Sequence, residues 1–178
     1  AKALESAIER TQAEDELNNA KIRMKAILDN IPFLAWLKDN KGGFLETNKA
    51  FQVACGKTAE DIVGKTDYDV WPEEMAEKYR TDDEEVMKNG LKKSVEERIE
   101  DKQGGVWFET YKTPIYDKEG KVIGTTGIAS DITERINMIS HIENQKNFLK
   151  QILNAIPDLI FYKDTSSVYL GCNEAFAE

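Results

Sequence analysis

The apolar positions of the chain are most regular shortly before its long C-terminal helical segment. Two runs rich in β-branched and aromatic residues, 106–116 and 122–130, are separated by residues 117–120, whose Asp and Gly suit a tight turn. This pattern predicts an antiparallel hairpin. The second run leads directly into a helical pattern, where Asp131 can cap the helix and Glu134 can bond back to the amide of the cap residue. The sequence therefore predicts a strand that continues into a helix without a linker.

The beginning of the chain is predicted to form one long helix. Residues 1–28 contain no Gly or Pro and are rich in Ala, Glu, Lys and Arg, which favour helix. Apolar side chains recur there at steps of three and four, as in a coiled-coil seam; they are Leu17, Ala20, Met24, Ile27 and Ile31. Such a stripe packs either on its own domain or on a second copy of the helix, and the sequence leaves both alternatives open.

Between this helix and the hairpin, short apolar runs alternate with turn residues. These runs predict strands at 33–37, 43–48 and 94–100, a turn at 102–105, and short helices at 48–56, 59–63 and 72–90. Hairpins at both ends of a domain, with helices between them, predict an α+β fold. We expect a five-stranded antiparallel sheet with short helices on one face, flanked by long N- and C-terminal helices.

An internal repeat sets the expected domain boundaries. The stretch ILNAIPDLIFYKDTSSVYLGCNEAFA at 152–177 aligns without a gap on ILDNIPFLAWLKDNKGGFLETNKAFQ at 27–52, an offset of 125 positions. A period of this length predicts one complete domain with its connecting helix, followed by a second copy. We expect an amphipathic helix at 1–26, a domain at 27–133, a connecting helix at 134–151 and the truncated start of a second domain at 152–178, all within a fragment of a longer protein.

Composition narrows the functional classes. A formal net charge of -9 argues against a nucleic-acid partner, because binding phosphates requires a basic stripe. No apolar run is long enough to span a bilayer. Because Ala1 is followed by neither a basic start nor an apolar signal core, we expect no signal peptide in this stretch. The two cysteines, Cys55 and Cys172, lack metal-site spacing and fit a reducing compartment. We expect a cytoplasmic module, whose parent protein could be anchored to a membrane elsewhere.

Several short motifs resemble the PAS domain family over about residues 26–135, and a second copy begins near Leu153. They are Ile31-Pro32, Lys38-Asp39, Asn48-Lys49-Ala50-Phe51, Gly64-Lys65-Thr66-Asp67, Lys112-Thr113-Pro114-Ile115, Gly124 and above all Asp131-Ile132-Thr133-Glu134-Arg135. The resemblance implies a sheet cupped around a small cavity, tandem copies in bacterial or archaeal sensor proteins, and homodimers formed through the flanking helices. It also implies a downstream output domain of the histidine kinase or diguanylate cyclase type.

Candidate ligand-binding residues lie on the segments that would form the wall of such a cavity. Aromatic side chains with polar tips can orient a ligand, although filling the core is their more common role. One strand alternation places Arg98 with Glu96 and Glu100, which favours a surface ion pair over an anion clamp. The sequence does not decide which face the hairpin residues occupy. The candidates are Tyr68, Trp71, Tyr79, Arg98, Tyr111, Lys112 and Thr126.

The resemblance leaves the ligand open but disfavours two cofactors. Haem-binding members carry a ligating His on the long helix after the Trp71 region, whereas the only histidine of this chain, His141, lies on the exit helix. Photoactive flavin members use a Cys in an Asn-Cys-Arg-Phe type helix, which the sequence VACGKT around Cys55 does not match. We predict no haem and no flavin adduct, and a small organic molecule remains a candidate.

No catalytic or metal-binding constellation is apparent. The run Asp82-Asp83-Glu84-Glu85 could suggest a metal site, but successive helical residues point around the cylinder, which favours a solvated face. The chain contains no assembled nucleophile and base, and no glycine-rich phosphate loop. We therefore predict a non-enzymatic sensory module. Two alternatives stay open: a ligand-free dimerisation and spacer module with a filled core, and a fragment of an enzyme whose catalytic domain is missing.

The helix that follows the hairpin is predicted to carry the signal. Between the strand and Pro157 there is no helix breaker, so a shift at Ser130 has a stiff path along the helix. By analogy with the family, we expect a rotation or register change of this helix within a dimer. The predicted relay residues are Asp131, Ile132, Thr133, Glu134 and Arg135.

Overall fold

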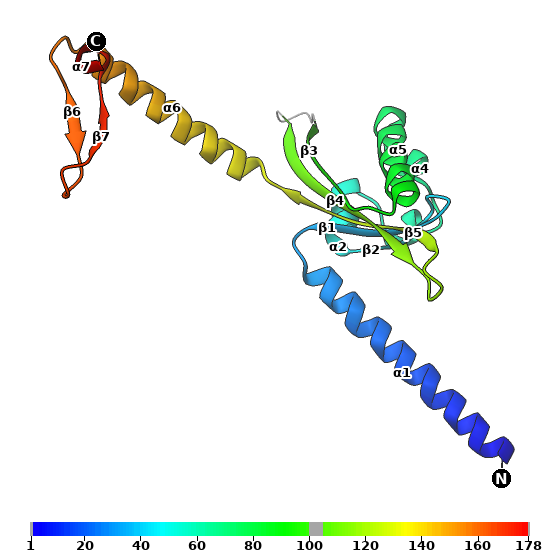
Figure 1. Cartoon of the computed structure of the whole chain (residues 1–178). Helices are drawn as coiled ribbons and strands as arrows, with labels where there is room; N and C mark the ends of the chain where they lie inside the picture. Colours follow the sequence, from blue (N-terminus) through cyan, green and yellow to red (C-terminus); the bar gives the residue numbers. More distant parts are fainter. Residues whose placement is uncertain (1, 100–104, 178) are drawn as a thin grey trace. The chain divides into compact units, whose positions relative to one another are not determined.

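A five-stranded antiparallel sheet in the order β2-β1-β5-β4-β3 forms the centre of the first part of the chain (Figure 1). The computed structural model describes residues 2–99 and 105–177 and divides into two units, one ending at Asp131 and one starting at Ile132. The strands are β1 (Leu34–Asp39), β2 (Phe44–Thr47), β3 (Lys93–Ile99), β4 (Val106–Tyr116) and β5 (Val122–Asp131). The predicted α+β fold with this sheet is confirmed. Glu100 of the strand predicted at 94–100, and residues 102–104 of the turn predicted at 102–105, lie outside the described residues.

Helices occupy the connection between the second and third strands. They are α2 (Lys49–Cys55), α3 (Ala59–Ile62), α4 (Asp67–Val70) and α5 (Glu73–Asn89), and the long helix α1 (Lys2–Asn30) precedes the sheet. Because side chains alternate along a strand, Leu34, Trp36 and Lys38 of β1 face α2, α4 and α5. Ala35 and Leu37 point to the opposite face, where they lie near residues of α1. We call these the inner and outer faces of the sheet.

Asn48 holds together the end of α1, the start of β1 and the start of α2. Its Oδ1 accepts hydrogen bonds from the backbone N–H groups of Ala35 and Phe51, both at 3.0 Å. Its Nδ2 donates to the carbonyl oxygens of Leu28 at 3.0 Å and Phe33 at 2.8 Å. Asn48 is also the N-cap of α2, as its sequence position predicted. These bonds satisfy backbone groups that a buried helix start would otherwise leave unpaired.

The passage from β5 to the next helix differs by one residue from the prediction. β5 continues to Asp131, which pairs with Phe108 of β4, and helix α6 (Thr133–Ala155) has Ile132 at its N-cap position. The prediction that Asp131 caps the helix was therefore wrong, because Asp131 still belongs to the ladder. A strand followed almost at once by a long helix is nevertheless what the structure shows.

The second unit consists of α6, the hairpin β6 (Phe161–Lys163) and β7 (Tyr169–Cys172), and the short helix α7 (Glu174–Ala177). Asn173 accepts hydrogen bonds from the N–H groups of Ile160 and Phe176, at 2.9 and 3.2 Å. It donates to the carbonyl oxygens of Leu153, Ile156 and Asp158, at 3.2, 3.1 and 2.8 Å. Each of these five contacts has a counterpart around Asn48 at an offset of 125 positions, and the counterpart of the Ile156 contact is a bond from Asn48 to the carbonyl oxygen of Ile31 at 3.5 Å. In the described part of the chain, no helix combines the length and apolarity that crossing a membrane requires.

Candidate ligand cavity and buried ion-pair network

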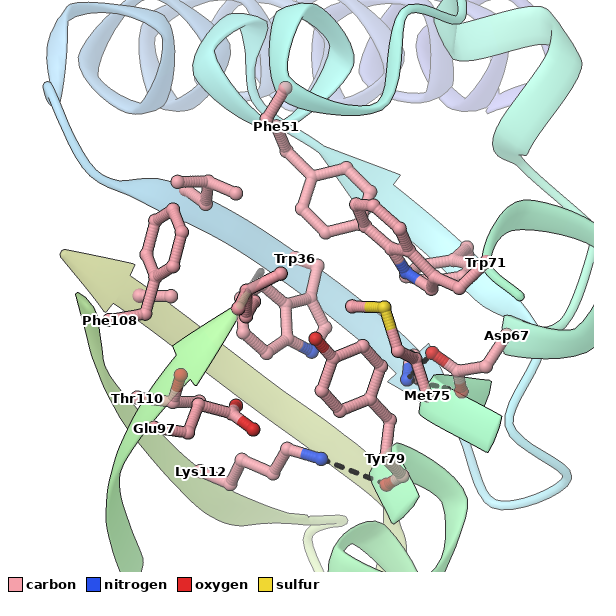
Figure 2. A pocket seen from close by; sticks show the side chains of 16 residues that line it. Trp36, Phe51, Asp67, Trp71, Met75, Tyr79, Glu97, Phe108, Thr110 and Lys112 are labelled. Atoms are coloured by element: carbon pink, nitrogen blue, oxygen red, sulfur yellow. Dashed lines mark hydrogen bonds and ion pairs between the residues drawn. The ribbon is translucent and has the colours of Figure 1, made fainter. Parts of the chain in front are cut away.

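A cavity of about 160 Å³ lies between the inner face of the sheet and helices α2, α4 and α5 (Figure 2). Its walls are mainly apolar and aromatic, and a small group of charged side chains lies at one side. The lining residues are Leu34, Trp36, Lys38, Phe44, Phe51, Ala54, Asp67, Trp71, Met75, Tyr79, Glu97, Ile99, Phe108, Thr110, Lys112 and Ala129. A mostly apolar enclosure with a few polar groups is the usual character of a small-molecule site.

Aromatic contacts fix the apolar wall. The ring of Phe51 lies 5.6 Å from Trp36, 5.4 Å from Phe44 and 5.7 Å from Trp71, measured between ring centroids. Trp71 in turn meets the ring of Tyr79 edge-on, at 6.2 Å. Tilted and edge-to-face arrangements at these separations are favourable beyond the area that they bury. The wall therefore joins α2 and α5 to strands β1 and β2.

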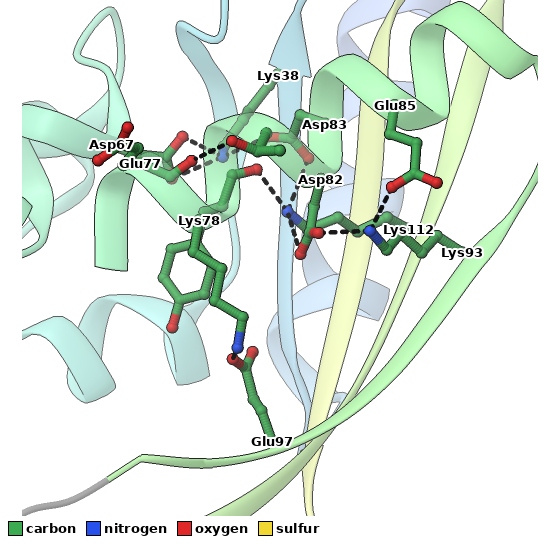
Figure 3. Close-up of polar contacts among 12 residues, drawn as sticks. Lys38, Asp67, Glu77, Lys78, Asp82, Asp83, Glu85, Lys93, Glu97 and Lys112 are labelled. Atoms are coloured by element: carbon green, nitrogen blue, oxygen red, sulfur yellow. Dashed lines mark hydrogen bonds and ion pairs between the residues drawn. The ribbon is translucent and has the colours of Figure 1, made fainter. Parts of the chain in front are cut away.

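Two lysines and two aspartates are buried beside this wall (Figure 3). The Nζ of Lys38 on β1 donates to both carboxylate oxygens of Asp67 on α4, at 2.7 and 2.6 Å, and to Oδ2 of Asp83 on α5, at 2.8 Å. All three are nearly inaccessible, with relative exposures of 2%, 1% and 1%. Since an ammonium has three donors, these contacts use every donor of Lys38.

Lys112 on β4 is the second buried ammonium. Its Nζ donates to the carbonyl oxygen of Tyr79 at 2.8 Å and lies 3.0 Å from Oδ1 of Asp83. Asp82 connects this pair toward the surface, because its carboxylate is 3.9 Å from Lys112 and 2.7 Å from Lys93 on β3. We name Lys38, Asp67, Asp83 and Lys112 the buried quartet. It joins α4 and α5 to β1 and β4, and its formal charges sum to zero.

Burial shifts the pKa of three groups in this region. Desolvation raises the pKa of Asp67, and the charge of Lys38 partly offsets the shift. Desolvation lowers the pKa of Lys112, against the opposing effect of the Asp83 charge. Burial also raises the pKa of the Tyr79 hydroxyl, with a further contribution from the charge of Glu97. The short contacts of Lys38 with both carboxylates indicate that the quartet is held as ion pairs.

The structure brings only part of the predicted ligand-binding set to the cavity. Trp71, Tyr79 and Lys112 line it. Tyr68 is 54% exposed, and Arg98 lies on the exposed alternation of β3, as its predicted surface position implied. Tyr111 and Thr126 lie on the outer face, where Tyr111 stacks under the ammonium of Lys92 and Thr126 donates to the carbonyl oxygen of Trp36. The predicted relay residues occupy the end of β5 and the first turn of α6.

Sequence reasoning missed the buried quartet. The run from Asp82 to Glu85 was predicted to be a solvated face, which is wrong for Asp82 and Asp83, with exposures of 8% and 1%, although Glu84 and Glu85 are exposed. Lys38 shares its strand alternation with Leu34 and Trp36, and this inward position was the available signal. Among the described residues, no group of three or more His, Cys, Asp or Glu is placed to hold a metal ion.

Comparisons with known proteins identify the first unit. The family model described as PAS fold matches residues 28–137. The aerobic respiration control sensor protein ArcB of Escherichia coli is 31% identical over 113 residues, which are 63% of this chain and 14% of ArcB. A diguanylate cyclase of Vibrio cholerae is 25% identical over 138 residues, 75% of this chain and 43% of that protein. The chain thus spans less than half the length of these two relatives.

A solved structure supports the same assignment. The crystal structure of a PAS domain from Colwellia psychrerythraea has a TM-score of 0.51 and 26% sequence identity, and the match covers 65% of this chain and 98% of that one. Three observations agree on a PAS fold: the order of the strands in the sheet, the helices on its inner face, and a family match over more than half of the sequence. The chain therefore belongs to the PAS fold family, through a PAS domain that occupies residues 28–137.

Proposed function

We propose that this chain is the sensory input module of a larger signalling protein, in which the cavity binds a small ligand and the helix after the sheet relays the change. The observation that carries the proposal is the cavity itself, which sits between the sheet and the helices that cover it. A molecule bound there contacts both layers at once. It can favour one packing of the layers over another only through such differential contacts.

The path toward the exit helix is short. Ala129 of β5 lines the cavity, β5 ends two residues later, and only Ile132 separates it from α6. A change in β5 would therefore act on the first turn of α6 through three consecutive residues. We propose that Asp131, Ile132, Thr133, Glu134 and Arg135 form this relay, in which β5 moves as part of the sheet and α6 as a rigid rod.

Homodimer formation through the flanking helices is part of the proposal. The apolar seam of α1 is largely exposed, with Leu17 at 58%, Met24 at 59% and Ile27 at 62%. A helix with an uncovered apolar stripe gains stability by packing on a partner. In a dimer, the exit helix of one copy can rotate or change register relative to the exit helix of the other copy.

The wider protein is inferred from the relatives. Because they include a sensor protein and a diguanylate cyclase, we propose an output domain of the histidine kinase or diguanylate cyclase type in the parent protein, with no catalytic residue in this chain and a cytoplasmic location. The matching contacts of Asn48 and Asn173 support residues 152–178 as the start of a second PAS domain.

The cavity favours a small organic molecule over a large cofactor. About 160 Å³ is well below the roughly 300–1,000 Å³ of drug-sized sites. The residues that line the cavity include no His or Cys, the side chains that haem ligation or a flavin adduct would use. We therefore propose neither haem nor flavin for this module.

Two equally small and buried alanines allow a direct test of ligand binding. Ala129 lines the cavity, whereas Ala35 is on the outer face, and their exposures are 6% and 5%. In a thermal-shift and native mass spectrometry screen of small metabolites, a ligand that binds only the folded state raises the melting temperature. Ala129→Leu should abolish that increase and Ala35→Leu should preserve it.

Hydrogen exchange tests the relay in the same samples. Ligand should change the exchange of the first turns of α6 in the unmodified chain, but not after two glycines are inserted behind Ile132. If no metabolite raises the melting temperature, the rival interpretation as a ligand-free dimerisation and spacer module replaces the sensor. If a ligand binds and α6 exchange is unchanged, the relay is refuted while ligand binding stands.

A further inference from the structure

The cavity has charged, aromatic and polar features that together define a class of ligand. Resting on the proposed function, we propose that its ligand is a neutral molecule of about one ring, which accepts a hydrogen bond from the indole N–H of Trp36. Three independent observations carry this assignment. They are the charge balance of the lining, the size of the cavity and a buried, unpaired donor on an indole that lines it.

The charged side chains of the lining already neutralise one another. They are the two cations Lys38 and Lys112 and the two anions Asp67 and Glu97, so their formal charges sum to zero. Lys38 and Lys112 are held by aspartates within the buried quartet. Glu97 is paired with Lys78 at 2.5 Å. The cavity therefore presents no excess charge for a ligand to balance.

An anionic ligand would have to compete for an ammonium that is already bound. All three donors of Lys38 are used by Asp67 and Asp83. Displacing either carboxylate would leave it buried without its counter-ion, and an uncompensated buried charge is strongly unfavourable. A cationic ligand faces the converse problem, because each carboxylate of the lining already has a lysine. A neutral ligand leaves every one of these pairs intact.

Size and wall chemistry select a ring. The volume of about 160 Å³ is close to the roughly 150 Å³ of an apolar protein cavity that binds benzene. Phe51, Trp71 and Phe108 present ring faces and edges to this space (Figure 2). Aromatic side chains pack well on a flat ring through offset and edge-to-face contacts. The cavity is thus matched to a single ring with small substituents.

The indole N–H of Trp36 is the donor that would orient the ligand in the cavity. Its Nε1 is buried and, within the described residues, has no hydrogen-bond partner, although buried donors are normally paired. The indole lines the cavity and lies against Gly127 of β5, where an added Cβ would come within 2.4 Å of the ring. The glycine thus lets the indole lie flat on the sheet. The phenol of Tyr79 points toward the indole from α5 (Figure 2). A ring nitrogen or carbonyl oxygen on the ligand would satisfy the indole donor.

Matched pairs of probes separate these features in nuclear magnetic resonance titrations of the ¹⁵N-labelled chain. Benzene and pyridine have the same size and differ by one acceptor, while benzamide and benzoate differ by one charge. The chain has three tryptophans, and Trp36→Phe identifies the indole N–H signal of Trp36 by its loss. We expect pyridine to change the chemical shift of this indole N–H signal by accepting its hydrogen bond. Benzene has no acceptor and should not produce this change. We expect benzoate to bind at least about tenfold more weakly than benzamide.

The ratio of pyridine to benzene affinity isolates the hydrogen bond from the shape of the cavity. Trp36→Phe should lower this ratio about tenfold, while the matched control Trp107→Phe, on β4 outside the lining, should not change it. The inference is overturned if benzoate binds as tightly as benzamide, or if the ratio is the same in both variants. Either result would still show ligand binding and leave the proposed function standing. If no probe and no metabolite binds, the proposed function fails and the inference with it.

Discussion

Replacing Lys38 by Met tests whether the buried quartet holds the helices on the sheet. The substitution keeps a long apolar side chain but removes the ammonium that lies 2.6 Å from Asp67 and 2.8 Å from Asp83. The formal charge of the quartet changes from zero to -1. Lys38, Asp67 and Asp83 are each at most 2% exposed, so this charge is not solvated. Removing one partner of a buried pair costs about 3–5 kcal/mol, and we expect Lys38→Met to lower the free energy of unfolding by about that amount.

The measurement is urea denaturation followed by tryptophan fluorescence, with linear extrapolation to water. Trp36, Trp71 and Trp107 all belong to the first unit, so the signal reports unfolding of the PAS domain. Lys25→Met is the matched control, because Lys25 pairs with Asp29 at 3.4 Å while both side chains stay more than one-third exposed. For the control we expect a loss below about 1 kcal/mol.

A second substitution should rescue the first. In Lys38→Met with Asp67→Asn, the quartet is again neutral and Asp83 keeps its contact with Lys112. The double variant should therefore be more stable than the sum of the single losses predicts, with a coupling energy of about 3 kcal/mol. Additive losses, or a Lys38→Met protein within about 1 kcal/mol of the unmodified chain, would refute the claim that these charges depend on each other.

The pH dependence of Lys38→Met has a defined sign. The pKa of Asp67 is already raised by burial, and removing the opposing Lys38 charge raises it further. The folded state then binds more protons than the unfolded state at pH values above the ordinary pKa of Asp, about 3.9. Stability must fall as pH rises through that window. The deficit of Lys38→Met should accordingly shrink when denaturation is repeated at lower pH, and a deficit that grows on acidification would contradict this reasoning.

Three further expectations concern single side chains. Asn48→Ala should lower the free energy of unfolding by about 3 kcal/mol in the same assay, because it leaves several buried backbone groups without hydrogen-bond partners. The control Asn173→Ala lies in the second unit and should leave the tryptophan fluorescence transition unchanged. Gly127→Ala should cost about 1–3 kcal/mol, since its Cβ would meet the Trp36 ring at 2.4 Å; equal stability would show that the indole can move. Burial raises the pKa of Tyr79, so stability should fall above the ordinary Tyr pKa of about 10, and Tyr79→Phe should flatten this fall in denaturations at alkaline pH.

Local features of the fold were predictable because their causes lie within a few residues. The turn at Asp117–Gly120 and the cap at Asn48 depend on backbone conformations and side-chain reach that neighbouring residues set. The exact start of α6 was not predictable, because Asp131 can serve equally as a cap or as a last strand residue. Pairing with Phe108, which is distant in sequence, decided between these roles.

Four of the seven predicted ligand-binding residues lie on strands, where the face that each one occupies decides whether it reaches the cavity. Lys112 and Tyr111 are adjacent, and a shift of one residue in register would exchange their faces. The pairing of β4 with β5 places Lys112 inside and Tyr111 outside. Tyr68, by contrast, belongs to a helix of only one turn, whose rotation relative to the sheet no local pattern specifies.

The sequence by itself determined the α+β class, the order of the strands and of the helices other than α4, the acidic charge and the motifs shared with the PAS family, because periodicity, turn residues and composition are properties of the linear chain. The one-turn helix α4, which carries Asp67, was not predicted. The tertiary structure decided that Asp67, Asp83, Lys38 and Lys112 meet, although as many as 74 positions separate them (112 minus 38). Whether a charged side chain is solvated or buried depends on what packs over it. Only the sheet and the helices across it bring these four charges, and the cavity beside them, into one place.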